Sequence, residues 1–172
     1  MLELFGVNQA TGTVDISKIE RFFSTPQQET TSIEFKSGGV SIEDLTKEVV
    51  AFLNTDGGLI FVGAPRETKV DGLRVCHGEL DSVKNFPNSD WIQQKLYSNI
   101  SPPPVGIEIF SAPTINPTFF LIHVTRSLTP PHQNSADGVY YVRIGEAKKP
   151  ASHGFVEALF NKRRAPSLVA DV

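Results

Sequence analysis

One segment, residues 29–63, constrains the fold of this 172-residue chain most strongly. Within it, residues 32–37 alternate apolar and polar side chains, which is typical of a strand with one buried face. An isoleucine and a phenylalanine share the apolar face, whereas Glu34 and Lys36 share the other. The pattern therefore predicts a strand that presents an acid and a base on its polar side.

A helix and a second strand are expected directly after this strand. Ser41 can cap the helix, with Asp44 three residues further on, as in a capping box. Apolar residues recur at helical spacing over residues 42–53, and a Gly-Gly pair follows as a stop signal. Residues 59–63 are apolar on both faces, which is expected of a central strand covered on each side.

The remaining elements complete a domain of mixed type. Three more helices are predicted, over residues 16–23, from residue 88 or 89 to the proline triplet at 102–104, and after Ser152. Short strands are predicted near residues 73–75, 105–110, 118–124 and 139–144. This order favours an α+β fold, a mixed β-sheet of about six strands with helices packed against it.

The length fits one ordinary hydrophobic core. We expect residues 1–15 to be an N-terminal extension, residues 16–164 to be the domain and residues 165–172 to be a C-terminal tail. Cys76 is the single cysteine, so an internal disulfide is excluded and a reducing compartment is favoured. With no apolar run of membrane length and no signal-peptide pattern, we expect a cytoplasmic protein, or a nuclear one in a eukaryote, that has no membrane partner.

Charge is distributed unevenly along the chain. Its formal net charge of −3 argues against a protein that coats DNA without specificity. Residues 1–125 carry 9 Lys and Arg against 15 Asp and Glu, whereas residues 126–172 carry 7 against 4. A surface that faces phosphate is therefore expected to draw on the C-terminal third, although a solvated basic helix end is the simpler interpretation.

Several motifs occur in a fixed order along the chain. They are Glu29, Glu34-Phe35-Lys36, Asn54-Thr55-Asp56-Gly57-Gly58, Phe61-Val62-Gly63-Ala64 and Tyr141-Val142-Arg143-Ile144-Gly145. Together with the proline triplet, this series resembles the AlbA-type domain of the Schlafen family over roughly residues 16–164. The resemblance implies a nucleic-acid-binding module, for RNA or DNA, which some family members use as a nuclease.

In nucleolytic Schlafens three acids form the site, and the resemblance assigns two of them here. Glu29 and Glu34 match the first two positions, whereas the third falls at Arg66. Converging carboxylates would hold Mg²⁺ or Mn²⁺, with Lys36 orienting phosphate, but an arginine at the edge repels a divalent cation. Binding, which needs no cofactor, is therefore favoured over metal-dependent cleavage of structured RNA such as tRNA.

The residues expected to contact nucleic acid include polar and basic side chains from several elements. They are Lys36, Asn54, Thr55, Arg66, Arg143, Lys148, Lys149, Arg163 and Arg164. Simpler interpretations exist: Glu34 and Lys36 can form an ordinary surface ion pair, Asn54 to Gly58 can simply end a helix, and the last basic residues can interact with a helix C-terminus.

Two further hypotheses concern partners. The net negative charge is compatible with a protein-interaction domain that has lost nucleic-acid contacts. Nucleolytic Schlafens form a clamp from two related lobes, and this chain supplies one. The resemblance therefore implies a homodimer or a heteromeric partner.

Overall fold

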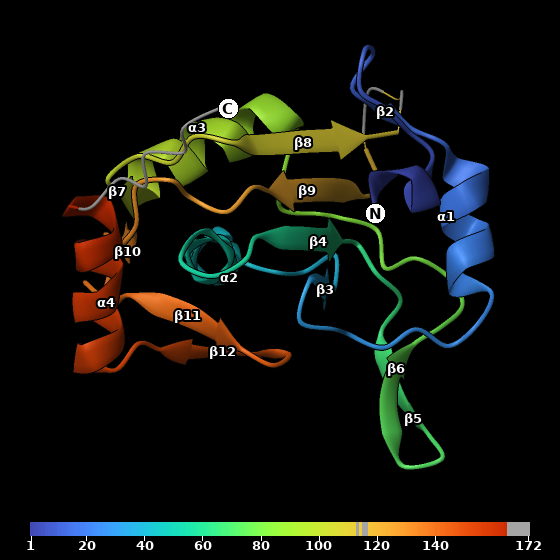
Figure 1. Ribbon diagram of the computed structural model, residues 1–172. Coiled ribbons are helices and arrows are strands. Elements are labelled where there is room, and N and C mark those ends of the chain that lie inside the picture. Colours follow the sequence, from blue (N-terminus) through green and yellow to red (C-terminus); the bar gives the residue numbers. More distant parts are fainter. Residues whose placement is uncertain (113, 115–116, 165–172) are drawn as a thin grey trace, which may run out of the picture.

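A mixed six-stranded sheet forms the centre of the molecule (Figure 1). The computed structural model describes residues 1–112, 114 and 117–164. β9 pairs antiparallel with both β8 and β4, whereas β3 is parallel to β4 and β2 is parallel to β8. In spatial order the strands are β1 (Val7–Asn8), β2 (Thr13–Val14), β8 (Ile107–Ser111), β9 (Phe120–Val124), β4 (Gly58–Val62) and β3 (Ile33–Lys36).

Helices cover both faces of this sheet, which gives three layers. On one face lie α2 (Ile42–Leu53) and α3 (Ser89–Asn99), and on the other lie η1 (Leu2–Phe5) and α1 (Ile16–Phe23). Successive side chains of β4 point to opposite faces of the sheet and therefore pack in different layers. Ile60 packs in the core beneath α2 and α3, whereas Phe61 packs with a group of phenylalanines on the α1 side.

The helices begin where the sequence predicts. Ser41 accepts a hydrogen bond from the Asp44 N–H, Asp15 accepts one from Ser17 and Asn88 accepts one from Trp91. Each cap satisfies an amide that the first helical turn leaves without a partner. The apolar stretch at the end of α2 is buried on nearly every side, because this helix lies between the sheet and a further hairpin.

Two β-hairpins extend from the body of the molecule (Figure 1). The first joins β5 (Glu67–Val70) to β6 (Leu73–Cys76) through Asp71 and Gly72, both of which have positive φ, as a tight two-residue turn requires. The second joins β11 (Tyr141–Ile144) to β12 (Ala147–Pro150) and lies against α2.

Two short strands and a fourth α-helix complete the fold. β7 (Ile100–Ser101) follows α3 and pairs with β10 (Gln133–Asn134). α4 (His153–Arg164) follows the second hairpin, with Ser152 accepting a hydrogen bond from Phe155 N–H.

The predicted α+β fold is confirmed, with differences in detail. Residues 1–15, expected as an extension, contribute two strands of the sheet and the fully buried Phe5. β12 was not predicted, because its Lys-Lys-Pro sequence lacks the residues that favour strands. On α4, Leu159 is buried, whereas Phe155 is 38% exposed. Residues 165–172, the expected tail, lie outside the described residues.

Among the described residues, no helix is both long enough and apolar enough to cross a membrane.

Candidate functional site

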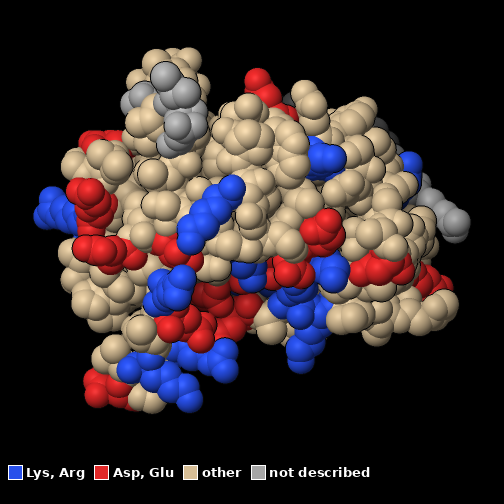
Figure 2. All heavy atoms as spheres, turned by 180° about the vertical axis from the view of Figure 1, so that it is seen from behind, with Lys and Arg blue, Asp and Glu red and all other residues tan. Residues whose placement is uncertain are grey.

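A cleft of about 520 Å³ lies between the two hairpins. Its walls come from β6 on one side and from the start of β12 on the other, including Leu73, Arg74 and Lys148. Its base is lined by Glu29, Glu34 and other residues. Figure 2 shows the hollow from behind, with acidic atoms in its depth and basic side chains around it. Two acids matched by the family pattern, Glu29 and Glu34, therefore meet at a concavity.

The acids in this cleft come from three separate segments. Glu34 lies on β3 directly opposite Ile60 of β4, so its side chain shares the face of the sheet that α2 covers. Glu48 projects from α2, and Glu29 lies in the connection before β3. The side chains of Glu34 and Glu48 are only 6% and 4% exposed. Buried carboxylates of this kind require charged or hydrogen-bonded partners.

Three cations supply those partners. Lys36 Nζ lies 2.6 Å from Glu34 Oε1 and 2.9 Å from Glu48 Oε1. Arg143 Nη1 lies 2.8 Å from Glu34 Oε2, and Lys148 Nζ lies 3.0 Å from Glu48 Oε1. We call the six residues Glu29, Glu34, Lys36, Glu48, Arg143 and Lys148 the floor cluster. Its formal charges balance, so the base of the cleft is less acidic than its carboxylates alone would make it.

Arg143 is an internal residue of the floor cluster. Its side chain is 1% exposed, and its guanidinium lies 4.5 Å from the centre of the Phe52 ring. Nε donates to the carbonyl of Thr31 and Nη2 donates to that of Thr30, with a longer contact to Ile33. Arg143 therefore ties β11 to β3 and to the segment before it. The predicted phosphate contact would require this buried group to leave its partners.

Glu29 lies closer to solvent than the other two acids. Its Oε1 accepts a hydrogen bond from the Phe35 N–H at 3.0 Å. Partial burial and the nearby Glu34 carboxylate raise the pKa of Glu29 to about 7. A perturbed acid that lines a cleft is a frequent property of functional sites.

The same environment shifts the pKa values of two other groups, Lys36 and Cys76. Burial by itself lowers the pKa of Lys36, but the Glu48 and Glu34 carboxylates outweigh this effect and raise it to about 12. Burial and the charges of Glu29, Glu67 and Glu34 raise the pKa of the Cys76 thiol to about 11. Lys36 therefore remains charged at neutral pH, whereas Cys76 remains a thiol rather than a reactive thiolate.

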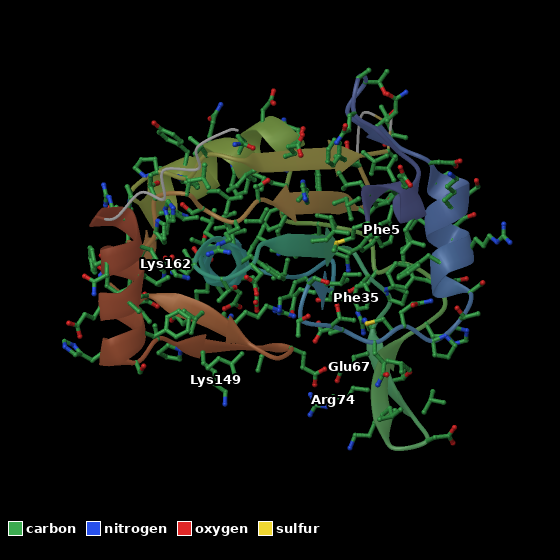
Figure 3. All side chains as sticks on the ribbon, viewed as in Figure 1. Phe5, Phe35, Glu67, Arg74, Lys149 and Lys162 are labelled. Atoms are coloured by element: carbon green, nitrogen blue, oxygen red, sulfur yellow. The ribbon has the colours of Figure 1, made fainter. Side chains whose placement is uncertain are left out.

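The β5–β6 hairpin places two more cations at the mouth of the cleft. Lys69 and Arg74 are direct cross-strand partners, so their side chains share one face of the hairpin. Arg74 lines the cleft with its side chain 73% exposed, and Glu67 lies 3.4 Å from it. Figure 3 shows Glu67 and Arg74 on the side of this hairpin that faces β11 and β12. We call Glu67, Lys69 and Arg74 the hairpin rim.

Other predicted site residues lie elsewhere. Asn54 is buried at the end of α2, where its amide donates to the carbonyls of His132 and Tyr141 and accepts from the His132 N–H. The Thr55 hydroxyl donates to the Ala51 carbonyl. The Arg66 side chain is 80% exposed and lies 3.8 Å from Asp81, outside the cleft lining. Their binding roles stay predictions.

The predicted basic edge at the C-terminus does not line the cleft. Lys149 is paired with Val142, so it projects from the face of β12 opposite to Lys148, and Figure 3 shows it pointing away from the body of the molecule. Arg163 lies on α4, close enough to His132 to lower the pKa of that buried imidazole, although burial is the larger cause. The side chain of Arg164 lies outside the described part of the chain.

The floor cluster does not fit the divalent cation that the resemblance implies. Both Glu34 oxygens lie against cations, and Glu29 Oε1 accepts from a backbone amide. Within the described residues, no three His, Cys, Asp or Glu side chains gather in a way that could hold a metal ion. Arg66 occupies the third acidic position of the pattern and does not reach the cleft. In this arrangement the carboxylates and the cations of the floor cluster neutralise one another.

Sequence reasoning missed Glu48, Lys69 and Arg74. For Glu48 a signal was present, because the apolar run Val49 to Leu53 indicates a helix buried on most sides, and a nearby acid must then find partners. For Lys69 and Arg74 the sequence does not show that the hairpin turns toward the cleft. Their position depends on how the hairpin packs.

Comparisons with known proteins agree with this fold. The sequence profile of the Schlafen, AlbA_2 family matches residues 29–152, which is more than half of the chain. The protein therefore belongs to the Schlafen, AlbA_2 family. Among curated proteins, none matches the sequence.

Solved structures with a similar fold include the following two. The DIP2311 protein from Corynebacterium diphtheriae superposes with a TM-score of 0.54 at 16% identity, over 95% of this chain and 27% of that chain. Our chain therefore spans about a quarter of that protein, and the likeness concerns the fold alone. The N-terminal domain of a RecG-related protein from Nitrosomonas europaea, named as an ATP-dependent DNA helicase, gives a TM-score of 0.49 at 22% identity, over 73% and 86% of the two chains.

Proposed function

We propose that this protein is a nucleic-acid-binding module that holds a polynucleotide across the cleft between its two hairpins. Lys69 and Arg74 contact phosphates from one side, and Lys148 contacts them from the other. The predicted role of Lys36 is retained as a charge close to the strand, since its side chain is 23% exposed. Membership of the Schlafen, AlbA_2 family supports this class of ligand.

The hairpin rim is the observation that carries the proposal. Like charges directly opposite each other in a sheet cost stability, and Lys69 faces Arg74 across β5 and β6. Glu67 offsets this repulsion only in part, because its contact with Arg74 is 3.4 Å long and exposed. An anionic ligand would remove the remaining repulsion, since phosphate accepts from both side chains.

The floor cluster does not oppose the approach of a polyanion. Glu34 and Glu48 are matched by Lys36, Arg143 and Lys148 within 3.0 Å. The raised pKa of Glu29, about 7, leaves this carboxyl partly protonated at neutral pH. At the mouth of the cleft the exposed cations Lys69 and Arg74 therefore act together with the exposed carboxylates of Glu67 and Glu146.

Fluorescence anisotropy with labelled RNA and DNA, measured across a salt series, tests the proposal. Wild type is expected to bind more tightly as salt falls, with a slope that reports the number of phosphate contacts. The double variant Lys69→Glu, Arg74→Glu is expected to lose affinity and to show a shallower slope. Lys84→Glu is a matched control, because Lys84 is exposed but lines a different cavity. Equal binding by all three proteins would overturn the proposal.

A second candidate function is metal-dependent cleavage of structured RNA such as tRNA. The observation in its favour is Glu29, a carboxyl of raised pKa beside Glu34 in an open cleft. Incubation of tRNA with Mn²⁺ or Mg²⁺ tests it, with Glu34→Ala and Glu146→Gln compared with wild type. Cleavage lost only in Glu34→Ala would support the nuclease. Identical products in all three proteins, or no products, would leave binding alone.

We further propose that a second copy or a heteromeric partner completes the interface, because one cleft of this size contacts only a short stretch of polynucleotide. Light scattering in the absence and presence of RNA measures the molar mass. A monomer in both conditions would contradict a homodimer.

A further inference from the structure

The charges of the cleft are arranged in depth. The exposed Arg74 lies on its wall, whereas the carboxylates of Glu29, Glu34 and Glu48 lie at its base, where Lys148, 23% exposed, pairs with Glu48. A ligand that fits this order carries negative charge at its outer end and hydrogen-bond donors at its inner end. A nucleotide with its phosphate outside and its base inside has this form. The volume, about 520 Å³, lies within the range of small-molecule sites, roughly 300–1,000 Å³.

The same arrangement discriminates against a double helix. A duplex presents its phosphates outward and keeps the Watson–Crick edges of its bases paired, so no base can reach the acids at the base of the cleft. A phosphate moved there instead would have to compete with Glu34 and Glu48 for cations that already pair with them. Only an unpaired nucleotide can place a base edge deep in the cleft while its phosphate remains at the hairpin rim.

Not every carboxylate oxygen at the base of the cleft has a hydrogen-bond donor, although Lys36 and Lys148 lie against Glu34 and Glu48 there. Glu48 Oε2 is buried and accepts no hydrogen bond, and Arg143 Nη1 lies 3.6 Å from it. Within the described part of the chain, the hydrogen-bond donor to Glu29 is the Phe35 N–H, which reaches only one of its two oxygens. An unsatisfied buried acceptor costs free energy, so a ligand with a donor group is favoured at this depth.

We infer that the cleft takes one unpaired nucleotide whose base bears an exocyclic amino group, and that Glu29 accepts a hydrogen bond from this group. The inference rests on the proposed function and adds to it a selectivity for bases with an exocyclic amino group. Carboxylates accept from the amino group of cytosine. Uracil differs from cytosine at this edge, where it presents a carbonyl oxygen that a carboxylate repels. Leu73, which lines the cleft with 54% of its surface exposed, covers one face of the base.

Oligocytidine and oligouridine of equal length test the inference, because both are single-stranded pyrimidine polymers with the same backbone. Anisotropy at mildly alkaline pH, where cytosine is neutral and Glu29 is ionised, is expected to show roughly tenfold tighter binding of oligocytidine. A duplex of the same length is expected to bind more weakly than oligocytidine. Equal affinity for the two homopolymers would overturn the inference while leaving the proposed function intact. Absence of binding to every probe would overturn both.

The variant Glu29→Gln sharpens the test. Glutamine can still accept from the Phe35 N–H through its carbonyl oxygen, but it presents an NH₂ donor where the carboxylate presented an acceptor. The preference for oligocytidine is therefore expected to vanish or to reverse toward oligouridine. Glu146→Gln, at an exposed acid that also lines the cleft, is expected to keep the preference. An unchanged preference in Glu29→Gln would contradict the assignment of Glu29.

Discussion

The floor cluster and the hairpin rim contain the same kinds of side chain in opposite environments. Arg143 is 1% exposed and contacts Glu34 at 2.8 Å, whereas Arg74 is 73% exposed and contacts Glu67 at 3.4 Å. Removing a charge from water is costly unless its partners replace the lost hydration. The buried Arg143 and Glu34 therefore depend on each other. The exposed pair gains little. Burial thus distinguishes charges that maintain the fold from charges that are free to meet a ligand.

The largest effect is expected from Arg143→Leu. This change leaves the buried Glu34 without its 2.8 Å partner and removes the donor to the carbonyls of Thr30 and Thr31. We expect a loss of about 3–5 kcal/mol in the free energy of unfolding. Urea denaturation followed by circular dichroism measures it. A loss no larger than that of Arg74→Leu would mean that the two regions do not differ as argued.

Asn54→Ala should have a smaller effect on stability. The Asn54 amide bridges His132 and Tyr141 through three hydrogen bonds of 2.7–2.9 Å in a buried setting. Alanine leaves those backbone groups without a partner, at a cost of about 2 kcal/mol. The same denaturation experiment checks this value, and nucleic-acid binding by the folded variant should be unchanged. Weaker binding at unchanged stability would instead support the contact predicted from sequence.

The pH dependence of stability tests the electrostatics of Glu29. The ordinary pKa of a glutamate carboxyl, which applies to the unfolded chain, is 4.5, whereas the pKa of Glu29 in the folded protein is about 7. The folded state therefore binds this proton more tightly than the unfolded state does. The contribution is fully present below pH 4.5 and is lost as pH rises through about 7. We expect a decrease of about 1 kcal/mol across this window, because the half-exposed site is screened. Urea midpoints at several pH values measure it, and Glu29→Gln should flatten this part of the profile. The same dependence of stability on pH in wild type and Glu29→Gln would contradict the raised pKa of Glu29.

The smallest effect is expected at the hairpin rim. Lys69→Ala combined with Arg74→Ala should change the free energy of unfolding by no more than about 0.5 kcal/mol, in either direction. Relief of the like-charge pair can even stabilise the hairpin. Thermal and urea denaturation measure the change. A large destabilisation would show that these cations act in the fold and would weaken the proposed binding role.

Local patterns in the sequence predict much of the fold. The cap at Ser41, the alternation around Glu34 and the apolar strand that follows α2 all reflect interactions between near neighbours, and they appear where expected. The two shortest strands of the sheet, over residues 7–14, were missed because two residues are too few to establish an alternating pattern.

The site was predicted less completely than the fold. Glu29, Glu34 and Lys36 are close together in the sequence, and the family pattern identified them. The partners that decide their chemistry are distant in the chain: Glu48 comes from α2 and Lys148 from β12. Arg143 was predicted to be a ligand contact, yet its strand packs against α2 and its side chain is 1% exposed, and burial of that kind is a property of tertiary packing.

The hydrogen bonds around β3 have a consequence for association between molecules. β3 is the last strand of the sheet, so one side of its backbone has no neighbouring strand. The Glu29 carboxylate accepts from Phe35 N–H there, and Thr30 N–H donates to the Ile33 carbonyl, which Arg143 also approaches. These groups block the addition of a strand from another chain, which is the usual route to edge-to-edge aggregation. Any dimer of this protein would therefore form through side chains and not by extending the sheet at β3.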